Sequence, residues 1–441
     1  MVFTDQYIRL TPTSKKLYER AVKVFPSGNT RTVLFYKPYP AYVKRGRGSH
    51  IWDVDGNERI DYCFNYGVLI LGHSHPKIIK TVKEQLENGL ALGAPTELEV
   101  NLAEKIVEKV PSAEMVRFTA SGTEAVMLAI RVARAYTGRD KILMFEGGFC
   151  GNYDAVSTSY TVGLPKQTYQ NTIYVPFNNP EILEKTIKKH KNELAAVITE
   201  PVFGANGPIV PKGDFLKEVR EITEKHDVLL IFDEVVTGFR LAPGGAAEFF
   251  GVKPDLVTFG KIMGGGFPAG AVCGRKELMN LFSFSESYFN KSWKTLLPHS
   301  GSFNAYPLAM AAGYVTLNEL TPQAYEHLNT LGEKIRKSLT KISEEVGVTF
   351  QVSGVGSLFQ IFFIDKEITD YKDVQKANDI LAHKLNLGLL TQGVYFSPTR
   401  PCNISTVTSY EDVDKMLEAV RYVLTNLKKE IREISPNLIS N

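Results

Sequence analysis

The middle of the chain alternates short apolar runs with amphipathic segments. The runs 195–201 (AAVITEP) and 228–235 (VLLIFDEV) are rich in branched apolar residues, and 255–261 (DLVTFGK) is a third such run. The segments 180–194 and 213–227 precede the first two runs and have the apolar spacing of helices that pack on one face. Strands that are buried on both faces and connected by helices form parallel sheets. The alternation therefore predicts an α/β fold.

Composition excludes several classes of protein. With 441 residues, 44% hydrophobic and 22% charged, the chain has the composition of a soluble globular protein of more than one domain. Its net charge of +3 and the lack of a basic block argue against nucleic acid or an anionic membrane as a partner. No signal-peptide core and no membrane-spanning apolar stretch is present. The four scattered cysteines favour the cytoplasm and argue against structural zinc.

The two ends of the chain differ in pattern from the middle. A long helical stretch over 309–345 precedes expected strands in 350–363 and a final helix over 410–431. Near the start, a loop rich in proline and aromatic residues leads to an expected hairpin that turns at Asp55-Gly56. We expect a large α/β domain over 71–315, a small α+β domain over 316–441, and an N-terminal segment, 1–70, that joins the small domain.

Three ionisable residues stand at the ends of the apolar runs. Glu200 ends the segment AAVITE, Asp233 ends LLIFD, and Lys261 follows DLVTFG. The carboxyl ends of parallel strands meet at one edge of a sheet, where α/β proteins bind ligands. Each residue taken alone could be a solvated strand end, but the three together predict one ligand site. The glycines on both sides of Lys261, in FGKIMGGGFPAG, indicate backbone packed closely around that amine.

A phosphate site is expected at the start of a long helix. Ser121, Gly122 and Thr123 precede this Ala-rich helix, and a helix N-terminus offers free N–H groups and partial positive charge to an anion. Ser121 and Glu124 also match a capping box, which is the alternative interpretation. The chain has neither a Walker motif nor a GxGxxG fingerprint.

A lysine, a carboxylate and a phosphate site together fit the cofactor pyridoxal 5'-phosphate (PLP). This cofactor needs a lysine for a Schiff base, an acid that keeps its pyridine nitrogen protonated, and a site for its phosphate. Lys261 could serve as both Schiff-base lysine and general base, and Asp233 as the partner of the pyridine nitrogen.

Several motifs then occur in the order typical of one family. They are WDVDGNERIDY, LGHSHP, SGTEAVMLAIRVAR, TGR, EP, FDEVVTGFR, FGKIMGGGFPAG and NAYPLAMAAG. From about Phe25 to the final helix the chain resembles the class III (ω-) aminotransferases of PLP fold type I. The resemblance implies a large domain with a mainly parallel seven-stranded sheet flanked by helices. It also implies a transaminase that works on an amino acid and a 2-oxo acid as a homodimer, with active sites at the subunit interface.

The resemblance assigns roles to further residues. It implies Phe149 and Val235 on opposite faces of the cofactor ring, Ser121, Gly122 and Thr123 on the phosphate, and Ser302 reaching the phosphate from the neighbouring subunit. Glu200 is expected near the ring or its substrate partner, with a solvated strand end as the alternative. The family usually has Tyr-His-Gly where this chain has Phe149-Cys150-Gly151. Cys150 is interpreted as an inert core residue, because nothing near it in sequence activates a thiolate.

Substrate recognition is expected from arginine, whose planar fork pairs with a carboxylate. Arg31 and Arg400 lie in expected loops outside the cofactor motifs. Phe35, Tyr36 and Tyr39 stand close to Arg31 in sequence and could form an apolar wall. We expect the amino donor to be a β-amino acid or an apolar or aromatic amino acid, although either arginine could instead belong to a loop surface.

Two other activities on the same scaffold remain open. The first is that of glutamate-1-semialdehyde 2,1-aminomutase, and the second is amino-acid racemisation or epimerisation. The aminomutase pattern has Ser-Pro-Val-Arg near its start, an asparagine where this chain has Ala205, and a glutamate in the loop that here reads SPTRPCN. The β-amino acid enzymes carry an Asn-Thr-Arg loop like Asn29-Thr30-Arg31. These details favour the transaminase.

Overall fold

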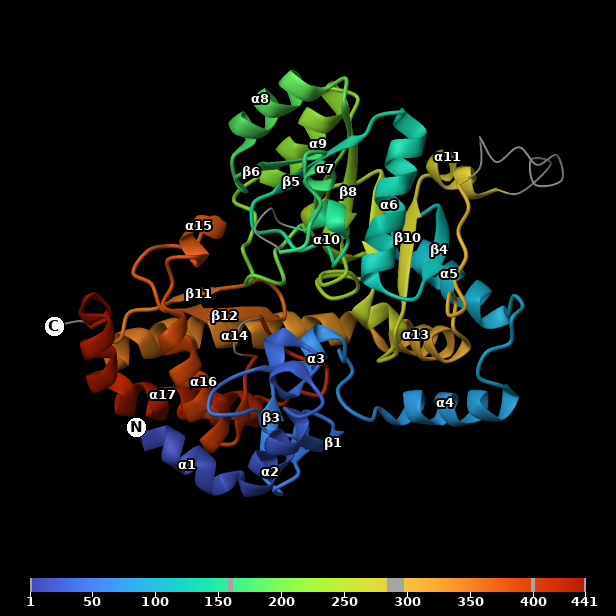
Figure 1. Cartoon of the computed structure of the whole chain (residues 1–441). Coiled ribbons are helices and arrows are strands. Elements are labelled where there is room, and N and C mark those ends of the chain that lie inside the picture. Colours follow the sequence, from blue (N-terminus) through green and yellow to red (C-terminus); the bar gives the residue numbers. More distant parts are fainter. Residues whose placement is uncertain (1, 158–161, 284–296, 398–400, 440–441) are drawn as a thin grey trace.

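The computed structural model describes residues 2–157, 162–283, 297–397 and 401–439. Its largest sheet has seven strands in the order β4-β10-β9-β8-β7-β5-β6 and forms the upper part of the molecule in Figure 1. The strands are β4 (Met115–Thr119), β5 (Lys141–Phe145), β6 (Thr172–Val175), β7 (Leu194–Thr199), β8 (Leu229–Asp233), β9 (Leu256–Phe259) and β10 (Gly270–Gly274). In this sheet β10 pairs antiparallel with β4 and with β9, and the other four pairs are parallel. The predicted α/β fold with a mainly parallel seven-stranded sheet is confirmed.

Helices cover both faces of this sheet. The helices of this part of the chain that the structure describes are α4 (Pro76–Asn88), α5 (Glu97–Lys109), α6 (Gly122–Thr137), α7 (Lys166–Tyr169), α8 (Pro180–His190), α9 (Phe215–Lys225), α10 (Gly245–Phe250), α11 (Lys276–Met279) and α13 (Pro307–Glu319). Of these, α4 packs on α13 and lies apart from the sheet (Figure 1). Alternate residues of β8 belong to two separate buried clusters: Leu230 and Phe232 share a cluster with side chains of α9, whereas Ile231 shares one with α6. Because successive side chains of a strand point to opposite faces, β8 is apolar on both faces from Leu229 to Phe232.

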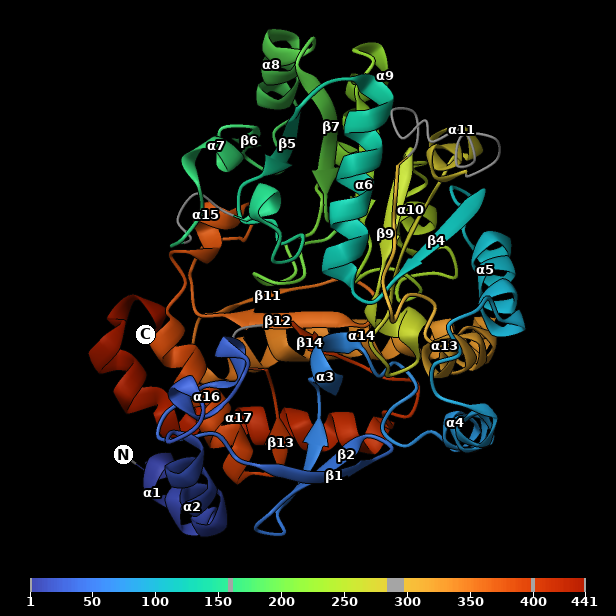
Figure 2. The same ribbon diagram turned by 45° about the vertical axis from the view of Figure 1, so that its right-hand side comes forward.

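A second part of the molecule combines the two ends of the chain (Figure 2). One sheet has the order β1-β2-β3-β13, and another has the order β11-β12-β14. The strands are β1 (Val43–Arg47), β2 (His50–Asp53), β3 (Glu58–Asp61), β11 (Gln351–Ser353), β12 (Leu358–Phe362), β13 (Val394–Tyr395) and β14 (Cys402–Asn403). The pairing of β3 with β13 brings the N-terminal segment onto the C-terminal part. The exact domain boundaries remain predictions.

The helices of this second part lie mainly around those small sheets. They are α1 (Val2–Leu10), α2 (Pro12–Ala21), α3 (Phe64–Gly67), α14 (Pro322–Val346), α15 (Tyr371–Val374), α16 (Asp379–Thr391) and α17 (Tyr410–Ile434). The expected hairpin is present, since β2 and β3 pair antiparallel and Asp53 Oδ1 accepts hydrogen bonds from the N–H groups of Asp55 and Asn57 at the turn.

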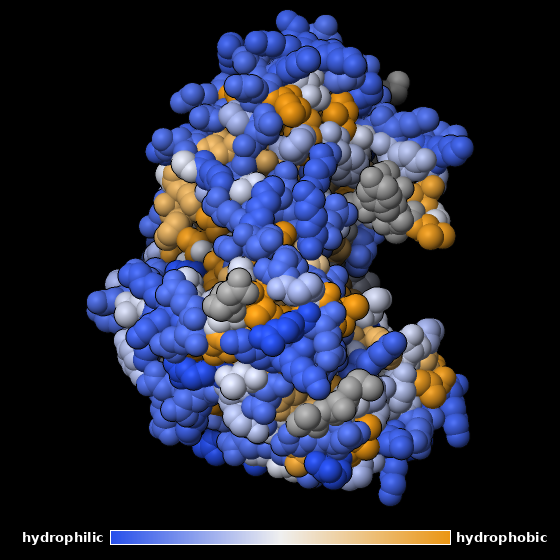
Figure 3. Space-filling view, turned by 90° about the vertical axis from the view of Figure 1, so that its left-hand side faces the viewer, coloured by the Kyte–Doolittle hydropathy of each residue, from blue (hydrophilic) through white to orange (hydrophobic). Residues whose placement is uncertain are grey.

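The helical stretch expected over 309–345 is interrupted. It forms α13 and α14, because Thr321 caps a new helix by accepting a hydrogen bond from the N–H of Ala324, and Pro322 occupies the first turn. None of the helices in the described ranges is both long and apolar enough to cross a lipid bilayer. The face in Figure 3 is mostly hydrophilic, with apolar residues gathered where the upper and lower parts meet and a hollow on one side.

Candidate active site

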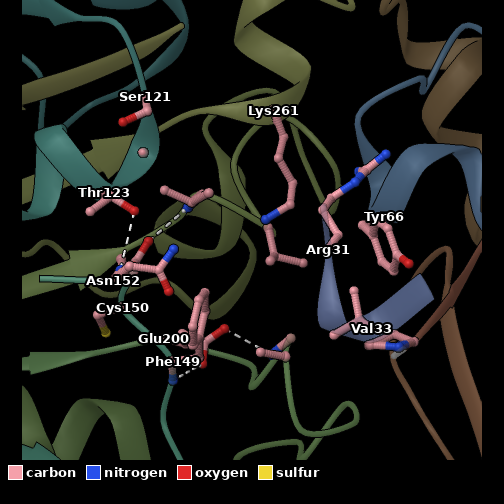
Figure 4. Close-up of a pocket in the computed structure, with 18 of the residues that line it drawn as sticks. Arg31, Val33, Tyr66, Ser121, Thr123, Phe149, Cys150, Asn152, Glu200 and Lys261 are labelled. Atoms are coloured by element: carbon pink, nitrogen blue, oxygen red, sulfur yellow. Dashed lines mark hydrogen bonds between the residues drawn. The ribbon is translucent and has the colours of Figure 1, made fainter. Parts of the chain in front are cut away.

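A cavity of about 600 Å³ lies at the carboxyl ends of β7, β8 and β9 (Figure 4). Glu200, Asp233 and Lys261 all line it, as the strand ends predict. These strands are adjacent and parallel, so the residues that follow them reach the same edge of the sheet. The N-terminus of α6 and the loop around Arg31 contribute other walls.

Asp233 is a buried carboxylate, with 3% of its surface exposed. Its Oδ1 accepts hydrogen bonds from the Val235 N–H at 3.0 Å and the Thr258 hydroxyl at 3.3 Å. Burial raises the pKa of Asp233, whereas these donors and the charge of Lys261 lower it. The carboxylate is therefore one that a buried cationic partner would stabilise.

Glu200 is also buried, so the solvated strand end is excluded. Its Oε1 accepts from the N–H of Phe149 and its Oε2 from the N–H of Gly204, each at 2.8 Å. Burial, followed by the neighbouring Asp233, raises the pKa of Glu200 to about 8. Because both carboxylate oxygens bind backbone, Glu200 holds the loop that carries Phe149.

Lys261 follows β9 at the start of a short 3-10 turn and lines the cavity. Its positive charge lowers the pKa values of Glu200 and Asp233, which places its charge close to both carboxyl groups. The glycines after it allow close packing, since a Cβ on Gly265 would lie 2.4 Å from the backbone of Ala312 in α13. This is the tight backbone packing that the glycine-rich sequence predicts.

Helix α6 begins at the cavity with Ser121 as its N-cap. The Ser121 hydroxyl accepts from the Glu124 N–H at 3.3 Å, so the capping interpretation holds for that side chain. Ser121, Gly122 and Thr123 nevertheless line the cavity. The first N–H groups of a helix have no intrahelical partner, so this helix start suits an anion. A Cβ on Gly122 would lie 2.8 Å from Val235 Cγ2, so glycine permits the close approach of the two segments.

Phe149, Cys150 and Val235 line the same cavity. Phe149 exposes 42% of its surface, so its side chain is not enclosed in the core. Burial, followed by Asp233, raises the pKa of the Cys150 thiol well above its usual value. The thiol is therefore protonated at neutral pH, in agreement with an inert core residue.

Arg31 lies on the opposite side of Lys261 from Ser121 and Thr123 in Figure 4. Its Nη1 donates to Asn65 Oδ1 at 2.8 Å, and its guanidinium carbon lies 5.6 Å from the centre of the Tyr66 ring. Across the described residues, no carboxylate forms an ion pair with Arg31. The cation is thus available for a ligand.

Other residues that the sequence predicts for the site do not line this cavity or lie outside the described residues. Ser302 lies on an exposed loop and does not line the cavity of its own chain, and Arg400 lies outside the described residues. The expected aromatic wall is wrong for Tyr36 and Tyr39, because both are buried in a separate cluster with Tyr7. Phe35 does not line the cavity either.

The sequence interpretation missed Tyr66 and Asn403, which both line the cavity. Tyr66 follows β3 in the segment FNYG, where an aromatic residue beside a glycine gave a weak signal. Asn403 belongs to the short strand β14 next to Arg400, and a lone asparagine in such a segment gives no signal of its own.

Comparison with known proteins identifies the family of this chain. The family model for "Aminotransferase class-III" matches residues 35–424. The chain belongs to this family. It is 42% identical to glutamate-1-semialdehyde 2,1-aminomutase of Methanothermobacter thermautotrophicus, covering 94% of this chain and 99% of that protein. The enzyme class predicted from the motifs is confirmed.

Solved structures of transaminases are similar over more than nine-tenths of this chain. An ω-transaminase from Sphaerobacter thermophilus has 39% identity and a TM-score of 0.88, covering 94% of this chain and 98% of that one. A β-phenylalanine aminotransferase from Variovorax paradoxus has 34% identity and a TM-score of 0.89, covering 97% of each chain. The predicted PLP fold type I is confirmed.

The cavity fits PLP. It combines a lysine amine, a buried acid and a helix N-terminus, and the predicted cofactor is confirmed by a solved transaminase with PLP bound that is 36% identical, with a TM-score of 0.88. That comparison covers 96% of this chain and 99% of the other. On the choice of reaction, the curated relatives support the aminomutase alternative better than the transaminase that we expected.

Proposed function

We propose that this protein is a glutamate-1-semialdehyde 2,1-aminomutase that uses PLP. The observation that carries this proposal is the 42% identity to curated aminomutases over 94% of the chain. The reaction exchanges the amino and oxo groups of neighbouring carbon atoms, so it is an isomerisation and consumes no second substrate. A cavity of about 600 Å³ has room for the cofactor and a small amino acid.

The cofactor would be held by the buried side of the cavity. Lys261 would bind it covalently, Asp233 would pair with its ring nitrogen, and the start of α6 would bind its phosphate. Phe149 and Val235 would contact its two faces. When bound, PLP supplies an electron sink that stabilises negative charge on the substrate carbon.

The chain's own groups then control the protons and the substrate. Nζ of Lys261 would take a proton from one substrate carbon and return it to the neighbouring one, because among the described residues that line the cavity Lys261 is the one lysine. Asp233 would keep the ring nitrogen protonated, since a charged partner offsets the cost of burying the carboxylate. Arg31 would hold the substrate carboxylate at the more open side.

Transamination of a β-amino acid or an apolar or aromatic amino acid is the second candidate. Ala205 and the Asn29-Thr30-Arg31 loop differ from the aminomutase pattern, and the transaminases named above are 34 and 39% identical. The cavity would suit either reaction, because both need a lysine base and a cation for a carboxylate.

A homodimer is part of the proposal. Apolar side chains of Val100, Val107 and Met115 are exposed, and they line a second cavity of about 920 Å³ next to the loop that contains Ser302. Such an apolar surface suits a second copy of the chain, which would bring Ser302 to the phosphate. Sedimentation at several concentrations tests this assembly. A cytoplasmic location likewise remains a prediction.

One assay separates the candidate reactions. Purified protein is given glutamate-1-semialdehyde with no 2-oxo acid, and the formation of 5-aminolevulinate is measured. The aminomutase proposal predicts many turnovers per subunit. Turnover that requires pyruvate or 2-oxoglutarate, with an amino acid as donor, would support the transaminase instead. Exchange of the α-proton with solvent without net conversion would support a racemase.

A further inference from the structure

Four consecutive residues beside the cavity have left-handed backbone conformations. The φ angles are 44° at Phe64, 52° at Asn65, 61° at Tyr66 and 81° at Gly67, so α3 is a single left-handed turn. Three of these residues carry a Cβ, which this conformation disfavours. Strain of this kind persists only where the surrounding structure enforces it, and it is common at ligand sites.

Buried charged groups hold both ends of this turn. Asp61 Oδ1 accepts from the N–H groups of Cys63 at 2.7 Å and Phe64 at 3.0 Å. At the other end, the fully buried Arg240 donates to the carbonyl oxygen of Gly67 and to the Ser357 hydroxyl. The backbone of the turn is thereby fixed before any ligand binds.

The turn presents Asn65 to Arg31. The 2.8 Å bond from Arg31 Nη1 to Asn65 Oδ1 joins two exposed side chains. Packing alone does not hold the guanidinium, because an exposed arginine has many accessible rotamers. Tyr66, the next residue of the turn, places its ring against the guanidinium. Asn65 and Tyr66 therefore restrict Arg31 on two sides.

The group that accepts the hydrogen bond from Arg31 is the neutral amide of Asn65. Its neutrality matters if Arg31 binds a carboxylate. An amide oxygen orients the guanidinium without neutralising it, whereas a carboxylate at the same place would form an ion pair with Arg31. We propose that Asn65 is a positioning residue that orients Arg31 for the substrate carboxylate while leaving its charge available. This inference rests on the carboxylate-binding role of Arg31 in the proposed function.

Two ligands that differ only in a carboxylate test the inference. The inhibition constants of 5-aminopentanoate and 1-aminopentane are measured for the holoenzyme and for Asn65→Gly, which tolerates the left-handed backbone. The loss of a hydrogen bond to a charged group predicts a rise of about tenfold for 5-aminopentanoate. The constant for 1-aminopentane should change less than about twofold. Asn65→Asp should weaken 5-aminopentanoate further, because it neutralises Arg31.

Control variants distinguish a failure of the Asn65 inference from a failure of the role proposed for Arg31. Asp227→Gly is the matched control, because Asp227 is another non-glycine residue with a left-handed backbone (φ 54°) and its carboxylate pairs with Arg139 outside the cavity. This variant should leave the ratio of the two inhibition constants unchanged. Arg31→Ala should weaken 5-aminopentanoate selectively, and adding Asn65→Gly to it should have no further effect. A selective loss in Arg31→Ala but none in either Asn65 variant would overturn this inference alone. No selective loss in Arg31→Ala would overturn the proposed role of Arg31 itself. Equal weakening of both ligands in Asn65→Gly, together with a lower melting temperature, would make Asn65 merely structural.

Discussion

The two sides of the cavity are built in different ways. The cofactor side consists of Glu200, Asp233, Lys261 and the start of α6, and it comes from adjacent strand ends of one sheet. The substrate side consists of the Thr30–Val33 loop, Tyr66 and Asn403, which come from three segments far apart in the chain. Both acids of the cofactor side are 3% exposed, whereas Arg31 is exposed. We infer that the sheet fixes the chemistry and that loops fix the choice of substrate.

The largest expected effect lies on the cofactor side. Lys261→Ala should lower turnover by at least about four orders of magnitude, because the variant lacks both the covalent attachment and the base. Steady-state assays check this, with Lys253→Ala as the control, since Lys253 is an exposed lysine outside the cavity. Substantial activity in Lys261→Ala would contradict the account of the cofactor side.

Asp233→Asn should give the next largest effect. A neutral amide cannot stabilise a protonated ring nitrogen, so we expect turnover to fall by about two to three orders of magnitude. The melting temperature and the PLP content should be measured in the same samples. A fall in turnover that only follows a loss of folded protein would give Asp233 a structural role.

Arg31→Ala should sharpen the contrast between the two sides. The Michaelis constant of the amino acid should rise by about 10- to 100-fold while turnover at saturation changes little, because the arginine binds a distant carboxylate. Reaction with an amine that lacks a carboxylate should be almost unaffected. Equal losses for both substrates would show that this loop does not set specificity.

The sequence predicts the cofactor side of the cavity better than the substrate side. Apolar runs with helices between them predict the sheet, and the residues that end those runs, Asp233 above all, follow from the strand direction. Tyr66 and Asn403 could not be predicted in this way, because their position depends on how separate loops fold back onto the sheet. Tyr36 and Tyr39 show the same limit, since closeness to Arg31 in sequence did not place them in the cavity.

The smallest expected effect is a change in how the stability of the cofactor-free protein depends on pH. Burial raises the pKa of Glu200 to about 8, above the value of about 4.5 expected in the unfolded chain. The stability that this group contributes is therefore complete below about pH 4.5 and is lost as the pH rises through about 8. Melting temperatures of the apoprotein should fall over this range, and Glu200→Gln should flatten the fall by a few degrees. An unchanged pH profile in Glu200→Gln would exclude this linkage.

The central claim is that the strand ends form a PLP site around Lys261. Holoenzyme is treated with borohydride, digested and analysed by mass spectrometry, which locates the covalently fixed cofactor. The account predicts one modified peptide per chain, carrying the reduced cofactor on Lys261, together with loss of the visible absorption of the holoenzyme. Modification of a different lysine, or no modification of protein loaded with PLP in its aldehyde form, would contradict the assignment of this cavity.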